Sequence, residues 1–280
     1  MSLTISAADV KRLRDKTDCS MMDCKKALQE SAGDFDKAIE WLKEKYKGKI
    51  ETRADRETGQ GRIGVYISPD ATTAGIVELR CETAPVARNE LFIELAAKLA
   101  KAIAHGPAEN PTPELINGLE VDGQSVQTHI ADVFAKLQET TRIASARKLT
   151  AAFVDAYVHH TGMVGCVLGV DARPSDAQAV KDACMHVAFS KSVAITRDQV
   201  PAAEVEAFRA ATRAEVLAQG KPENIVDKIV DGKMNAFFAE RVLPEQEHTN
   251  PKYERKSVLD SLKPVGVSKI VAAVVYEIAG

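Results

Sequence analysis

The chain has 280 residues, which is enough for two or more domains. Apolar residues make up 45% and charged residues 28%, as in an ordinary globular protein, and the net charge of −3 gives no strong positive field for nucleic acid. The five cysteines are an odd number without a C-x-x-C pair, which favours a reduced compartment over a disulfide framework. No secretory pattern and no membrane-length apolar run are present, so we expect a cytoplasmic protein that binds neither membrane nor nucleic acid directly.

Three short helical patterns occupy the N-terminal part of the chain. Capping signals at Ser6, Ser20 and Asp34 open them in turn. We predict a three-helix module of the ubiquitin-associated type over residues 1–48 and a linker over residues 49–60. The charged linker segment also fits a continued helix, and its pattern does not choose between the two.

A strand that stops abruptly and becomes a helix is the central feature of the next segment. Residues 76–81 alternate near period two, and from Val86 apolar side chains recur every four residues, as on one face of a helix. Between them, Thr83 can cap exposed amides, and Pro85 is tolerated because a first helical turn needs no N–H there. A short rigid tip at the surface follows, and we expect function at this tip.

The tip belongs to a pattern that occurs twice. Residues 61–68 and 75–81 read as a hairpin followed by a helix to His105, and a further helix is predicted over residues 125–146. Strand composition then returns at 149–158 and 163–170, and a helix capped by Ser175 follows. The repeat predicts two related subdomains. They are core subdomain N over residues 61–147 and core subdomain C over residues 148–190 and 241–280.

Residues 191–240 contain two further helical patterns separated by Gly220-Lys221-Pro222. They predict an inserted hairpin of two antiparallel helices. This hairpin packs either on its own chain or on a second copy in a homodimer, and the sequence fits both. Residues 266–279 are rich in β-branched side chains and predict an edge or central strand. The fold class is therefore α+β.

Enzyme chemistry finds little support. The sequence has no Walker loop, G-x-G-x-x-G, G-x-S-x-G or H-E-x-x-H motif. His159 and His160 are metal-ligand candidates beside a turn, but neighbours on a strand point apart and a third ligand is missing. Cys19 and Cys24 meet the same objection and fit buried thiols better. A thiol- or metal-dependent enzyme is thus the weakest hypothesis, and we predict no catalytic residue, no metal and no cofactor.

A pair of methionines next to lysines marks the second helix of the module. Soft side chains such as Met21 and Met22 suit adaptable contacts, so together with Lys25 they favour a binding face. Methionines in the module core beside solvated lysines fit the composition equally well. The sequence leaves both interpretations open.

Short motifs in one order run from Ser6 to about Leu262. They include Arg12-Leu-Arg-Asp-Lys-Thr17, Met21-Met-Asp-Cys-Lys-Lys-Ala-Leu28, Cys81-Glu-Thr83, Val86-Ala-Arg-Asn-Glu90, Met185-His-Val-Ala188, Gly220-Lys-Pro-Glu223 and Ile229-Val-Asp-Gly-Lys-Met234. In this order the chain resembles elongation factor Ts, the nucleotide exchange factor of the GTPase elongation factor Tu. The resemblance implies an N-terminal three-helix module, a two-subdomain core, and an inserted hairpin that some members use for dimerisation.

The resemblance also implies the residues that bind the partner. The family's module helix contacts the GTPase domain, and its second hairpin turn contacts another partner domain. The corresponding residues here are Arg14, Met21, Met22 and Lys25 in the module and His159 in the turn.

The tip departs from the family pattern. The family reads Thr-Asp-Phe-Val, and its aromatic side chain wedges into the GTPase near the magnesium and phosphate site, whereas this chain reads Thr83-Ala84-Pro85-Val86. We therefore predict an exchange factor that binds GDP-bound and nucleotide-free elongation factor Tu. The alternative is a partner-binding paralogue with weakened or lost exchange activity. A second departure lies at Gln246-Glu247-His248, where the family follows Gln with Pro-Phe.

Overall fold

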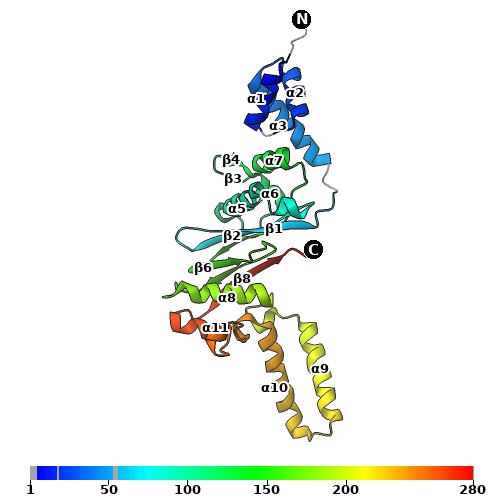
Figure 1. The fold of residues 1–280 in the computed structure, drawn as a ribbon. Coiled ribbons are helices and arrows are strands. Elements are labelled where there is room, and N and C mark those ends of the chain that lie inside the picture. Colours follow the sequence, from blue (N-terminus) through cyan, green and yellow to red (C-terminus); the bar gives the residue numbers. More distant parts are fainter. Residues whose placement is uncertain (1–4, 18, 53–55, 280) are drawn as a thin grey trace.

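The computed structural model describes residues 5–17, 19–52 and 56–279 and is a mixed α+β protein. The N-terminal helices lie at one end, two three-stranded antiparallel sheets lie in the middle, and a pair of long helices projects at the other end (Figure 1). The predicted α+β class is confirmed. None of the described helices is long and apolar enough to cross a membrane.

The N-terminal helices begin where the capping signals predict. They are α1 (Ala7–Thr17), α2 (Met21–Glu30) and α3 (Phe35–Thr52). The Ser20 hydroxyl accepts a hydrogen bond from the Asp23 amide at 3.2 Å, and the Asp34 carboxylate caps α3 in the same way. α3 includes residues 49–52 of the expected linker, so the helical alternative holds there, and residues 53–55 lie outside the described residues.

The two sheets have the same arrangement. The first has the strand order β1-β2-β5 and the second β6-β7-β8, and every neighbouring pair is antiparallel. The strands are β1 (Gln60–Ile67), β2 (Thr73–Cys81), β5 (Arg142–Thr150), β6 (Phe153–Val158), β7 (Val164–Val170) and β8 (Ile270–Glu277). Both predicted hairpins, β1-β2 and β6-β7, are confirmed. The C-terminal strand β8 is an edge strand.

The prediction for residues 125–158 is wrong in two respects. α7 (Val126–Leu137) ends at Gln138, whose backbone is left-handed with φ 57° and donates to the Phe134 carbonyl. Residues 142–146, expected in this helix, belong to β5. The single strand expected over residues 149–158 is divided between β5 and β6, which lie in different sheets.

The sheets pack face to face between helices. α5 (Glu90–His105) covers the first sheet and α8 (Ala177–Ser190) covers the second (Figure 1). β2 is buried on both faces, because Val77 and Leu79 pack toward α5 while Ile76 packs with Val167 between the sheets. The strand that leads to the tip is therefore fixed on both sides.

The start of α8 also differs from the prediction. Asp176, and not Ser175, caps this helix, since its carboxylate accepts the Gln178 amide at 2.9 Å. The Ser175 hydroxyl instead donates to the Val265 carbonyl. Its partner is thus supplied by a distant segment that local spacing does not reveal.

The long helical pair consists of α9 (Ala202–Ala218) and α10 (Glu223–Arg241). Phe208 stacks on Phe237 with ring centroids 4.4 Å apart, and Val216 and Val226 are buried near the far end. The two predicted helices thus pack on each other within one chain. The remaining described elements are α4 (Ala84–Ala87), α6 (Pro113–Asn117), β3 (Glu120–Val121), β4 (Gln124–Ser125), η1 (Arg197–Gln199), η2 (Leu243–Glu245), η3 (Pro251–Tyr253), α11 (Val258–Leu262) and η4 (Lys263–Val265).

Candidate partner-binding site

The tip, residues 83–86, follows β2 and includes the first three residues of the four-residue helix α4 (Ala84–Ala87). The chain then breaks before α5, because the Asn89 side chain accepts the Leu91 amide at 2.9 Å and caps the longer helix. The helix expected to run on from Val86 is therefore interrupted. Pro85 lies in the first turn of α4 and is exposed, so its missing N–H leaves no hydrogen bond unmade.

Two carboxylates hold the tip in place. The Thr83 hydroxyl donates to Glu139 Oε1 at 2.6 Å and the Thr83 amide donates to Oε2 at 3.0 Å. The second carboxylate, that of Glu82, accepts hydrogen bonds from the Thr140 amide at 2.8 Å and from the Arg56 guanidinium at 2.9 Å. The prediction that Thr83 caps helix amides is wrong, because Glu139 offers its hydroxyl a charged acceptor.

The charge state of this clamp follows from its contacts. Burial alone would raise the pKa of Glu82, but the Thr140 amide and the Arg56 guanidinium outweigh it and lower the pKa. Beneath the tip, burial and then the charge of Glu139 raise the pKa of Cys81 to about 12. Glu82 is thus ionised at neutral pH, and the Cys81 thiol is protonated.

The structure brings the tip close to the turn between β6 and β7. Together with the start of β1 they line a cavity of about 510 Å³, which we call the arginine groove. Its lining residues are Gln60, Gly61, Arg62, Ala84, Ala87, Arg88, Ile93, His160, Thr161 and Met163. His159 lies in the same turn, where its Nδ1 is 2.8 Å from the Thr161 hydroxyl. Two of the predicted site elements are therefore neighbours.

The argument that His159 and His160 point apart is wrong. The two residues lie in a turn and not on a strand, and their ring centroids are 4.0 Å apart. Within the described ranges, no three His, Cys, Asp or Glu side chains are grouped so that they could hold a metal ion. Cys19 and Cys24 are buried, and burial raises the pKa of Cys24, which argues against a thiolate nucleophile.

The methionines of α2 face solvent. Met21 is 43% exposed and Met22 is 73% exposed, and Arg14 and Lys25 are exposed as well. The module core is built from other side chains, namely Val10, Leu13, Cys19, Cys24, Ala27, Leu28, Ala38, Leu42 and Tyr46. The interpretation that placed both methionines in the core is therefore wrong. We call Arg14, Met21, Met22 and Lys25 the module face.

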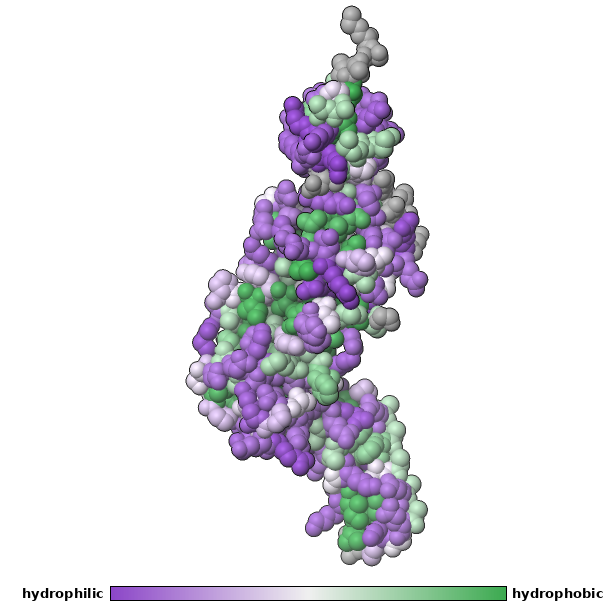
Figure 2. Space-filling view, in the orientation of Figure 1, coloured by the Kyte–Doolittle hydropathy of each residue, from purple (hydrophilic) through white to green (hydrophobic). Residues whose placement is uncertain are grey.

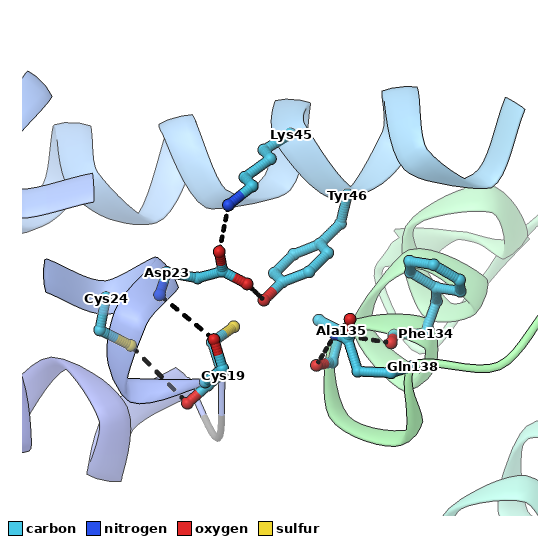
Figure 3. Close-up of polar contacts among 9 residues, drawn as sticks. Cys19, Asp23, Cys24, Lys45, Tyr46, Phe134, Ala135 and Gln138 are labelled. Carbon is cyan, nitrogen blue, oxygen red and sulfur yellow. Dashed lines mark hydrogen bonds and ion pairs between the residues drawn. The ribbon is translucent and has the colours of Figure 1, made fainter. Parts of the chain in front are cut away.

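Tyr46 of α3 attaches the module to the core. Its ring lies edge-on to Phe134 of α7 at 6.1 Å, and its hydroxyl donates to Asp23 at 2.7 Å (Figure 3). Lys45 forms an ion pair with the same carboxylate. Burial, and then the Asp23 hydrogen bond, raise the pKa of Tyr46, so its hydroxyl stays a donor. Asp23 directly follows Met22, so these contacts also position the module face.

Sequence reasoning missed the partners that hold the site. Glu139 and Thr140 are distant from the tip in sequence, and the Tyr46–Phe134 contact joins two separate helices. Local periodicity carries no signal for such pairs. Arg88 was visible only as a member of the motif Val86-Ala-Arg-Asn-Glu90.

In the second departure, Gln246-Glu247-His248, the side chains of Gln246 and His248 are buried in a polar cluster, while Glu247 is exposed and pairs with Arg255. The Thr249 amide donates to His186 Nδ1 at 3.1 Å, so the protonated Nε2 of His186 donates to Gln246 at 2.8 Å. The Asn250 amide donates to His248 Nδ1 at 3.0 Å. Both imidazoles therefore act as neutral acceptors at Nδ1. Burial and the neighbouring His186 lower the pKa of His248 to about 4.

This cluster predicts a loss of stability in mild acid. The groups around His248 are His186, Asp182, Lys252 and Tyr253, whose ring centroid lies 4.3 Å away, and burial also lowers the pKa of His186. Between pH ~6.5 and pH ~4 the histidine is protonated in the unfolded chain but neutral in the folded chain. The contribution of His248 to the free energy of unfolding is therefore complete above pH ~6.5 and is lost as the pH falls toward ~4. We expect the free energy of unfolding to fall by about 2 kcal/mol between pH 7 and pH 5 through His248.

Urea titrations at each pH measure this effect. His248→Gln should flatten the curve in this window, while His105→Gln, at an exposed position on α5, should leave the slope unchanged. Equal slopes for the unsubstituted chain and His248→Gln would show that His248 does not control the pH dependence.

A clamped, solvent-facing tip and an exposed methionine face are features of a protein that acts through surface contacts. Comparison with known proteins defines the family. A family model described as elongation factor TS matches residues 82–279. The elongation factor Ts of Nitratidesulfovibrio vulgaris is 36% identical over 271 residues, covering 93% of this chain and 89% of the relative.

Two further relatives match over nearly their whole length. The elongation factor Ts of Aquifex aeolicus is 37% identical over 279 residues, covering 96% of this chain and 95% of the relative. That of Chlorobaculum parvum is 38% identical over 283 residues, covering 98% of each. The chain therefore belongs to the elongation factor Ts family, and the resemblance found in the sequence is confirmed.

Proposed function

We propose that this chain is a guanine-nucleotide exchange factor of elongation factor Tu that acts in the cytoplasm. It binds the GDP-bound and the nucleotide-free GTPase and promotes GDP release by disturbing the magnesium and phosphate site. The observation that carries this proposal is the rigid, exposed tip at residues 83–86, held by Glu82 and Glu139. Family membership supports the identity of the partner.

Exchange of this kind is a coupling between two binding sites. A factor that binds the nucleotide-free GTPase more tightly than the GDP-bound form must weaken GDP binding by the same factor. The module face supplies exposed methionines for affinity, His159 and its turn supply a second contact, and the clamped tip supplies the strain on the nucleotide site. A preformed tip favours this mechanism because little ordering free energy is lost on binding.

The alternative function is a binding partner of the same GTPase with weakened or lost exchange. The specific observation in its favour is the pair Ala84-Pro85, which replaces the family's acidic and aromatic residues. The tip therefore presents a half-buried methyl group and an exposed proline ring, without an aromatic side chain.

The domain organisation fits the same proposal. In each half, a hairpin precedes a covering helix and a third strand pairs with the second strand of the hairpin, which supports two diverged subdomains. The α9–α10 hairpin is the candidate dimer contact. Leu217 and Ile225 are 46% and 38% exposed near its end, where Figure 2 shows apolar surface among hydrophilic side chains.

Affinity for the two states of the partner tests the proposal. We expect the chain to bind nucleotide-free elongation factor Tu at least ~10-fold more tightly than the GDP-bound form. Met22→Ala should weaken binding to both forms, since it removes exposed contact area, and Leu115→Ala, at another exposed apolar position on α6, should change neither. Equal affinity for the two forms would exclude exchange by this coupling.

A further inference from the structure

The arginine groove carries positive charge that the rest of the structure does not neutralise. Its lining includes Arg62, Arg88 and His160 and no acidic residue. By contrast, Arg80 of β2 pairs with Glu78 at 2.6 Å, and Arg56, which precedes β1, pairs with Glu82 at 2.9 Å. In the part of the chain that the structure describes, no ion pair joins Arg62 or Arg88 to a carboxylate. Two guanidinium groups beside the tip are thus available to another molecule.

The walls of the groove are fixed. The Ile63 amide donates to the Gly162 carbonyl at 2.8 Å and ties β1 to the β6–β7 turn. The Arg62 side chain lies against that turn, since a Cβ at Gly162 would sit 2.7 Å from its Nη1. Arg88 immediately follows α4, and its amide bonds back to the Ala84 and Pro85 carbonyls. Both arginines therefore line one cavity from anchored backbone segments.

We propose that the arginine groove binds acidic side chains of the GTPase partner, and that Arg62 and Arg88 determine specificity for them. This inference rests on the proposed function for the identity of the partner. A guanidinium fork matches a carboxylate in a bidentate geometry, and a cavity of about 510 Å³ accommodates a short stretch of side chains. Ala84, Ile93 and Met163 give the lining apolar patches, which suit the methylene groups of Asp or Glu.

The position of the groove favours a protein partner. It adjoins both the tip and the turn that carries His159, so a molecule seated on those two elements also covers the groove. The net charge of the chain is −3, which disfavours a polyanion such as RNA on its surface as a whole. A local pair of arginines in such a chain selects an acidic patch of limited size.

The test compares three forms of the full chain for binding to nucleotide-free elongation factor Tu. Arg62→Gln with Arg88→Gln should weaken binding by about 10- to 100-fold at low salt, mainly by slowing association, and the loss should shrink as salt screens the charges. Arg62→Lys with Arg88→Lys should recover part of the affinity, because charge returns without the fork. A charge-matched control, Lys256→Gln with Lys269→Gln at exposed positions outside the groove, the tip and the helical hairpin, should stay within about twofold.

Each outcome has a defined meaning. If the unsubstituted chain and the double glutamine variant bind equally well and are equally stable to heat, the groove does not bind the partner's acidic side chains. The proposed function is then left intact. If the unsubstituted chain does not bind the GTPase, the proposed function is wrong, and the proposal that the groove binds this partner is wrong as well. An effect of the arginines on binding a short RNA, without an effect on the GTPase, overturns the choice of a protein ligand.

Discussion

Ala84→Asp combined with Pro85→Phe is expected to accelerate GDP release from elongation factor Tu by about 30- to 1000-fold over the unsubstituted chain. Aromatic interface anchors are worth ~2–4 kcal/mol on truncation, and ~1.4 kcal/mol is tenfold in rate. The tip is already held by Glu82 and Glu139, so a phenylalanine at position 85 would project from a rigid backbone. Stopped-flow release of a fluorescent GDP at saturating factor measures the change.

The local structure accepts both substitutions. Residue 85 is exposed in the first turn of α4, so a phenyl ring there projects into solvent and displaces no buried neighbour. Ala84 lies four residues before Arg88, so an aspartate at position 84 is placed to pair with that guanidinium. Pro85→Phe alone therefore separates the contribution of the wedge from that of the acid. If the unsubstituted chain already gives fast GDP release and neither variant increases the rate, residues elsewhere in the interface promote the release.

Gly75→Ala is expected to lower the free energy of unfolding by about 3–4 kcal/mol. A Cβ at this position would lie 2.1 Å from the Ala100 carbonyl oxygen and 2.8 Å from the Ala104 amide nitrogen, both in the backbone of α5. Backbone atoms of a packed helix cannot rotate away as a flexible side chain can, so α5 must shift off β2. Urea titration measures the loss, and slower GDP exchange should accompany it because β2 carries the tip.

Gly232→Ala is the matched control for this prediction. Gly232 lies exposed within α10, and a Cβ there meets nothing within 4 Å. The same chemical change should raise the free energy of unfolding by about 0.5–1 kcal/mol, since alanine favours the helix. Similar effects of the two substitutions would show that close packing of α5 on β2 is not what Gly75 protects.

The features that the sequence predicted correctly depend on short-range rules. The caps at Ser20 and Asp34 and the tolerated Pro85 each need only a few neighbouring residues, and all three are found in the structure. The strand-to-helix change after residue 81 follows from a switch of periodicity over one segment. Local physical chemistry was sufficient to place the tip.

The start of β5 shows why other features were not predictable. A bulge opposite Glu78 and Leu79 leaves Ala144 unpaired in the ladder, so Ile143 and Ala146 pack on the same face although they are three residues apart. A spacing of three is also typical of a helix, so these two residues do not by themselves distinguish β5 from a longer α7. Only the pairing with β2 distinguishes the two structures, and that pairing is a long-range contact.

The site shows the same limit. Exposure of Met21 and Met22 was undecided in the sequence, because composition does not reveal which face of a short helix the bundle covers. The contacts of Thr83 with Glu139 join residues that lie far apart in the chain. Such pairs become visible only once the fold places the end of β2 beside the connection from α7 to β5.

The most direct test of the proposed function is the rate of fluorescent GDP release from the cognate elongation factor Tu with the unsubstituted chain at saturating concentration. An exchange factor should raise this rate above spontaneous release, with a dependence on its concentration that reaches a plateau. Saturated binding without any acceleration would contradict exchange activity and support the alternative, a binding partner whose Ala84-Pro85 tip no longer opens the nucleotide site.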